Sequence, residues 1–318
     1  MTRIEPKDAD QRAAIAKLRR VIDKVKSLTQ GIDMFIWGTG VVVVHAPYEQ
    51  AARGPASGVN SSQNDLRVWY VLSHESVHMV QSITTSFVAS ISFDFANLVN
   101  FVRRSVKRAA PEEMWLPRAL EHFSQLQARL NQPTEGWLSA LHVIEAHAVI
   151  EGFRGTFSRY TEEGLVNVIK IAHNLNIFYS DLIGSCLKDY GFKFTMDVFP
   201  RLCWLSLQDG NPARKYLECL TRLREYGIDK SIALDAPSLC GVLGFDAAHL
   251  RKSLRQRWPE ISTHPLSALF DPYWSVFEKD DSVEAALQIQ MTPGKARDAF
   301  ALRDLMPPLY YLMVTWSL

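Results

Sequence analysis

The sequence predicts a mainly α-helical protein with a small β element, an α+β fold class. Apolar residues recur at the three- and four-residue spacing of amphipathic helices through most of the 318 residues. One short run stands out because it is rich in β-branched and aromatic residues, as strands are. No internal repeat and no break in composition divides the chain, so we expect a single domain spanning residues 1–318.

The N-terminal part, residues 1–65, is predicted to contain a helix, a strand and a loop. Residues Asp8–Leu28 carry apolar side chains on one helical stripe and basic side chains opposite it. Residues Met34–His45 form the β-branched run and predict a strand, which could bend into a hairpin at Gly38–Gly40. Residues Ala46–Asn64 are rich in Gly, Pro, Ser and Asn, and therefore predict a mobile loop.

Helices are expected through the rest of the chain. Within residues 66–160, a helix should begin at Leu66 after the N-cap Asp65 and continue to Lys107, with a break near Ser90–Asp94. Two more are expected at Pro111–Asn131 and Glu135–Tyr160. The helical C-terminal part, residues 161–318, should contain helices at Glu162–Tyr190, Pro212–Tyr226, Ala247–Trp258, Pro265–Phe277, Ser282–Gln290 and Pro293–Leu305. Prolines 111, 212 and 293 each lie where a first helical turn is expected.

The composition excludes several classes of protein. The chain has 35 Lys and Arg against 34 Asp and Glu, which argues against a nucleic-acid-binding surface that dominates the molecule. Its 4 cysteines are not paired at CxxC spacing, so we expect reduced, buried thiols. The sequence has no secretory signal and no apolar stretch of the roughly 20 residues that span a bilayer. We therefore expect a cytoplasmic protein without a membrane span or a nucleic-acid partner.

The motif HExxH lies within the helix that begins at Leu66. Residues four apart share a helical face, so His74 and His78 can bind one metal ion together. Glu75 is displaced by about 100° around the helix axis and lies beside such an ion instead of on it. In that position Glu75 can take a proton from water that a zinc ion has acidified. The spacing therefore fits metal-assisted hydrolysis.

A second window, His142–Gly152, carries further candidate ligands. Together with Val71–Gln81 it resembles the zincin metallopeptidases, and in particular the gluzincins, in which a glutamate on a second helix completes the zinc site. The resemblance covers these two windows alone. It implies a zincin-like active-site helix pair packed beside a short sheet, with Zn²⁺ on His74, His78 and a downstream glutamate, and with Glu75 as the general base.

Three residues of the second window compete for the place of third ligand. Glu145 is favoured because Ala146 and Ala148 next to it are small and would let the second helix approach the first closely. Glu151 is the second candidate and His147 the third. A gluzincin usually has an aspartate four residues after the ligand glutamate, but this chain has valine there. Glu151 or His142 could instead orient a ligand histidine.

These motifs predict a zinc metallopeptidase acting on a peptide or protein substrate. The strand at Met34–His45 could pair with an extended substrate, or it could simply pack against the helix. Tyr160, His173 and Tyr179 follow the second window and are unranked candidates for a donor to the oxyanion. Two other functions fit the same residues: an iron enzyme with two histidines and one carboxylate as ligands, and a non-catalytic helical interaction module.

Two further segments are candidate contact surfaces. The tail Leu305–Leu318 is too apolar to remain in water, so it should pack into the core or form a partner or oligomer contact. The run Arg103–Arg108 is a basic helix end, most simply explained as solvated, with an anionic-lipid or nucleic-acid role as the alternative.

Overall fold

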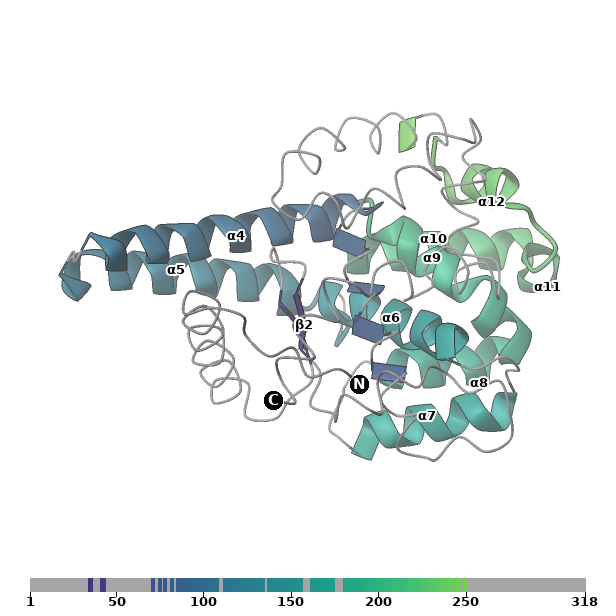
Figure 1. Cartoon of the computed structure of the whole chain (residues 1–318). Coiled ribbons are helices and arrows are strands. Elements are labelled where there is room, and N and C mark those ends of the chain that lie inside the picture. The colour runs from purple at the N-terminus through teal and green to yellow at the C-terminus, as the bar shows by residue number, and fades with distance from the viewer. Residues whose placement is uncertain are drawn as a thin grey trace, which may run out of the picture.

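The described part of the computed structural model is built mainly from helices (Figure 1). The structure describes residues 34–36, 41–43 and 70–250, apart from gaps at 72–73, 76, 79–80, 83, 109–110, 135, 157–160, 175–179 and 247–248. The described residues between 70 and 84 are helical apart from these gaps. The helices that follow are α4 (Ser86–Lys107), α5 (Glu112–Asn131), α6 (Ala140–Thr156), α7 (Glu162–Asn174), α8 (Ser180–Asp197), α9 (Phe199–Ser206), α10 (Pro212–Tyr226), α11 (Ile228–Ser231) and α12 (Ala236–Leu243).

The predicted α+β class is wrong, because the described chain is mainly α-helical. Strands β1 (Met34–Ile36) and β2 (Val41–Val43) have three residues each and pair antiparallel, with Ile36 opposite Val41. Two strands of this length are too small to supply one face of a core. The main contacts of the described helices are with other helices, and those of the two strands are with each other. A zincin-like helix pair packed beside a sheet is therefore not what the described residues form.

Helix α6 lies at the centre of the helical core. It contacts α5, α8, α9 and α10, and all of its apolar side chains except the half-buried Leu141 are buried. A helix that is apolar all round is stable only when other helices surround it. Fully buried residues of α6 and α9 make up much of this core, among them Val143, Ile144, Ala146, Ile150, Leu202, Cys203 and Leu205.

Several predicted boundaries agree with the structure and others do not. Helix α10 begins at Pro212, and the Asn211 side chain caps it by accepting a hydrogen bond from the Arg214 N–H. The expected break near Ser90–Asp94 is wrong, because the chain is extended at Thr85 and helical from there to Lys107. The expected helix from residue 162 to 190 is two helices, α7 and α8. The expected N-terminal helix, the loop, the tail and nearly all of the last four helices lie outside the described residues.

The break at Thr85 fixes the end of the HExxH segment against the core. The Trp204 indole of α9 donates to the Thr84 hydroxyl at 3.0 Å, and the Gln208 side chain donates to the Thr84 carbonyl at 3.0 Å. Both donors belong to the region where α9 ends, so this segment and α9 are held together at the point where α4 begins. The helical segment from residue 70 to 84 is thereby positioned beside the central helix.

Candidate metal site

The HExxH segment and α6 approach each other closely at Gly152. A Cβ atom added at Gly152 would lie 3.0 Å from the Cα and 3.1 Å from the N and Cβ of His74. Any larger residue would therefore push the two helices apart. The prediction attributed the close approach to Ala146 and Ala148, which are both fully buried, but the measured contact with His74 is made by the glycine.

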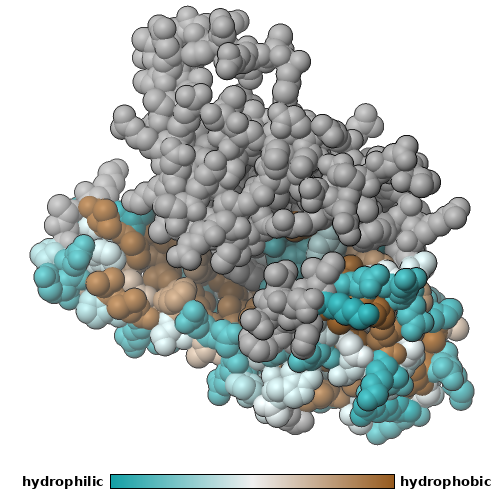
Figure 2. Space-filling model, turned by 90° about the horizontal axis from the view of Figure 1, so that it is seen from below, coloured by the Kyte–Doolittle hydropathy of each residue, from teal (hydrophilic) through white to brown (hydrophobic). Residues whose placement is uncertain are grey.

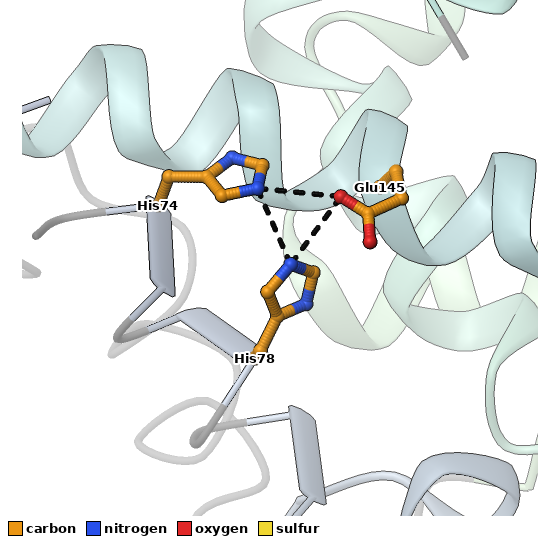
Figure 3. A group of neighbouring side chains, drawn as sticks. All are labelled: His74, His78 and Glu145. Carbon is orange, nitrogen blue, oxygen red and sulfur yellow. Dashed lines mark hydrogen bonds and ion pairs between the residues drawn. The ribbon is translucent and has the colours of Figure 1, made fainter. Parts of the chain in front are cut away.

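This approach brings His74, His78 and Glu145 together (Figure 3). The Nε2 atoms of His74 and His78 are 3.2 Å apart, and each lies 3.3 Å from Oε2 of Glu145. Both histidines are buried, with 8% and 4% of their surface exposed. In the part of the chain that the structure describes, this is the one group of three or more His, Cys, Asp or Glu side chains whose ligand atoms converge in this way.

The triangle of ligand atoms has the dimensions of a metal site. In a tetrahedron with metal–ligand bonds of about 2.05 Å, ligand atoms lie about 3.3 Å apart. The three measured edges are 3.2, 3.3 and 3.3 Å. Two imidazoles and one carboxylate are also a known ligand set for a catalytic zinc that keeps a fourth position open. The group could therefore hold a metal ion, whose identity the geometry leaves open.

Gln81 orients one of the two histidines. Its Nε2 donates to the Ile144 carbonyl at 2.9 Å, and because a carbonyl can only accept, this fixes which way the amide faces. Its Oε1 therefore accepts from Nδ1 of His78 at 2.9 Å. Neutral His78 is then protonated at Nδ1 and has its lone pair on Nε2, facing His74 and Glu145.

The other candidates of the second window have different partners. Nδ1 of His147 lies 2.8 Å from the Gln81 amide nitrogen and accepts its second hydrogen. Glu151 accepts from Arg154 at 2.8 Å, and Nδ1 of His142 lies 2.8 Å from the Ser139 hydroxyl. Neither Glu151 nor His142 orients His78, contrary to the expectation. Gln81 does so from within the HExxH segment, three residues after the histidine, where the helical spacing alone could have suggested it.

The three groups form a strongly coupled charged cluster. Burial disfavours a charge on His78, but Glu145, helped by Glu75 and Gln81, outweighs this and raises the pKa of His78 to about 9. Burial acts to raise the pKa of Glu145, but the two histidines hold it far below its ordinary value. Without a metal, the site therefore contains an ionised carboxylate beside a protonated imidazole at neutral pH.

Two further side chains lie close to this cluster. Glu75 is buried, with 8% exposed, and is near enough to raise the pKa of both His78 and Tyr70. The Tyr70 ring centroid is 6.0 Å from that of His74. Burial, with Glu145 and Glu75 nearby, raises the pKa of Tyr70 well above its ordinary value, so its hydroxyl remains a hydrogen-bond donor. The sequence prediction missed Tyr70, although it lies four residues before His74.

The remaining predicted residues fall outside the cluster. The side chains of Tyr160, His173 and Tyr179 lie outside the described residues. The four cysteines are free and buried, as predicted: Cys186, Cys203, Cys219 and Cys240. Among the described helices, none is both long and apolar enough to cross a membrane.

Comparison with known proteins adds no family or relative: no protein-family model, no curated protein and no solved structure matches the chain. The geometry of the His74, His78 and Glu145 group is therefore what indicates a function.

Proposed function

We propose that the protein is a zinc-dependent metallopeptidase in which His74, His78 and Glu145 bind the ion and Glu75 is the general base. The observation that carries the proposal is the triangle of ligand atoms, whose edges of 3.2–3.3 Å match a tetrahedral site. A peptide bond is favoured over other hydrolysable bonds by the resemblance of Val71–Gln81 and His142–Gly152 to the gluzincins.

Each residue has a distinct part in the proposed reaction. When bound, zinc would supply Lewis acidity that lowers the pKa of water at the site to about 7. Glu75 would accept the proton of the attacking water at its carboxylate and later deliver it to the leaving amine nitrogen. Gln81 would keep the Nε2 lone pair of His78 directed at the ion by accepting from Nδ1. The buried surroundings of the group support this chemistry, because charge interactions are stronger where water is excluded.

The proposal is tested by measuring metal content and hydrolysis on the same preparations. The Glu75→Gln variant should retain the metal and lose hydrolysis of a mixed peptide library, because its ligands remain while the base is gone. The His78→Ala and Glu145→Ala variants should lose both. His122→Ala and Glu121→Gln, on the exposed face of α5, are the matched controls and should behave like the unmodified chain.

Three results would contradict the proposal in different ways. Bound iron together with a requirement for a cosubstrate would replace the peptidase by an iron enzyme that uses the same ligands. Full hydrolysis by Glu75→Gln would remove the general base from the mechanism. A metal-free chain that still cleaves peptides after His78→Ala would remove the site altogether.

A further inference from the structure

Helices α7 and α8 lie side by side, and residues of both line a cavity of about 540 Å³ (Figure 1). Cavities that hold small ligands typically have volumes of about 300–1,000 Å³, so this one has room for a small organic molecule. Gly184 of α8 lies on its wall, and a Cβ atom added there would meet nothing within 4 Å. The absence of a side chain at this position therefore keeps part of the cavity open.

The lining of this α7–α8 cavity carries more positive than negative charge. Lys170 of α7 and Lys188 of α8 both line it, and neither forms an ion pair within the described part of the chain. Asp181 is the one acidic residue of the lining, and it lies in the first turn of α8, where the helix N-terminus favours negative charge. Figure 2, which views the molecule from below, shows many hydrophilic residues on the part of the described surface away from α4 and α5. The cavity therefore favours an anion.

One buried polar group of the lining has no partner. Ser180 is the only buried residue of the lining, with 1% of its surface exposed, whereas both lysines are exposed. The Ser180 hydroxyl forms no hydrogen bond with any residue that the structure describes. Buried hydroxyls in folded proteins are nearly always paired with protein, water or ligand atoms. An occupant that extends from the exposed lysines to Ser180 would supply the missing partner.

These groups fit a phosphate better than a simple carboxylate. A phosphate has several acceptor oxygens and up to two negative charges, so it can accept from two ammonium groups and a hydroxyl at the same time. The N-terminus of a helix also favours a phosphate through its N–H groups and its dipole. An inorganic phosphate ion is much smaller than the cavity, which leaves room for an organic group beside Gly184 and Ile169. The Asp181 carboxylate can accept hydrogen bonds from hydroxyls of that group.

We propose that the α7–α8 cavity binds a small phosphate ester that carries hydroxyl groups. Lys170, Lys188 and the Ser180 hydroxyl bind the phosphate, and Asp181 accepts from the hydroxyls of the organic part. No residue of the lining belongs to the His74, His78 and Glu145 group, so this is a second site in the same chain. Its occupancy does not depend on what reaction the candidate metal site performs.

The test is isothermal titration calorimetry of the full-length chain with three probes: ribose 5-phosphate, inorganic phosphate and ribose. The chain is first freed of metal by a chelator that is then removed, because phosphate also binds metal ions. Ribose 5-phosphate should bind more tightly than inorganic phosphate, since its hydroxyls add contacts, and ribose should give no measurable heat. His78→Ala should bind ribose 5-phosphate like the unmodified chain, which separates this site from the candidate metal site.

Substitutions in the lining should weaken the binding of ribose 5-phosphate. Lys170→Gln and Lys188→Gln should each lower the affinity about 10-fold, because each removes a hydrogen bond to a charged group. Ser180→Ala should lower it about fivefold and should leave the urea unfolding of the unliganded chain unchanged, because its hydroxyl has no partner there. Gly184→Leu should abolish binding by filling the cavity.

Matched controls separate the α7–α8 cavity from general attraction between charges. Lys193→Gln changes a lysine of α8 that is exposed and does not line the cavity, and it should bind ribose 5-phosphate like the unmodified chain. Circular dichroism should show that all variants are folded. Added salt should weaken the binding of both phosphate probes, because the lysines are exposed.

Three outcomes would overturn the proposal. The first is no binding of either phosphate probe by the folded, unmodified chain. The second is binding of ribose 5-phosphate that the substitutions at Lys170, Lys188 and Gly184 leave unchanged. The third is binding of ribose as tight as that of ribose 5-phosphate, which would show that the phosphate is not recognised.

Discussion

Replacing Gln81 by methionine should weaken metal binding, although Gln81 is not itself one of the candidate ligands. Methionine has nearly the same length and volume, but it can neither accept from Nδ1 of His78 nor donate to Ile144 and His147. The change removes three buried hydrogen bonds and creates no cavity. It therefore isolates the contribution of polar contacts from that of packing.

The expected magnitudes follow from these contacts. Loss of the group that orients a ligand histidine typically costs about 10- to 100-fold in metal affinity. The ring nitrogens of His78 and His147 both lose a buried partner, at about 1–3 kcal/mol each, so the free energy of unfolding should fall by about 2–6 kcal/mol. The variant Gln81→Glu should retain more affinity than Gln81→Met, because a carboxylate oxygen can still accept from His78.

The assay is competition for zinc against a chromophoric chelator, with urea unfolding of the metal-free chain measured in parallel. Gln127→Met, an exposed glutamine of α5, is the control and should change neither quantity. An orienting role for Gln81 is refuted if Gln81→Met lowers the free energy of unfolding while zinc affinity stays at the level of the unmodified chain. Gln81 would then support the packing of the two helices without orienting His78.

Three other predictions concern the same structure. Gly152→Ala should lower both zinc affinity and stability, by about 1–3 kcal/mol in unfolding, because its Cβ would meet the His74 backbone at 3.0 Å. Gly184→Ala, where a Cβ meets nothing within 4 Å, should be neutral or slightly stabilising in the same urea titration. Since the pKa of metal-free His78 is about 9, zinc must displace a proton at neutral pH, so apparent affinity should rise about tenfold per pH unit up to pH 9. A pH-independent affinity in calorimetric titration would contradict this assignment. The buried thiols, such as Cys186 with a pKa raised by burial to about 12, should react with a thiol reagent only after unfolding, and rapid reaction of the native chain would contradict their burial.

The sequence correctly predicted features that depend only on residues within a few positions of each other. The start of α10 follows from Asn211 and Pro212, because a side-chain cap and a fixed φ act within one turn. The convergence of His74 and His78 follows from their spacing by four residues on a helix. Neither feature depends on contacts with residues far away in the sequence.

Features that depend on tertiary contacts were missed or placed wrongly. The helix break occurs at Thr85 and not near Ser90, because the contacts that hold it come from Trp204 and Gln208, more than 100 residues away. The β-branched run suggested a sheet beside the site, but only three residues on each side pair, and the core is built by helices. The spacing of Gln81 from His78 is local, but the direction in which its amide faces depends on Ile144 and His147 on another helix, which spacing along one helix does not reveal.

X-ray absorption spectroscopy of the zinc-loaded, full-length chain measures most directly which atoms hold the metal. We expect two imidazole nitrogens and oxygen ligands at about 2.0–2.1 Å, with the imidazole signal reduced in His78→Ala. Sulfur ligands at about 2.3 Å, or an all-oxygen shell that His78→Ala leaves unchanged, would contradict the assignment of His74, His78 and Glu145 as the metal site.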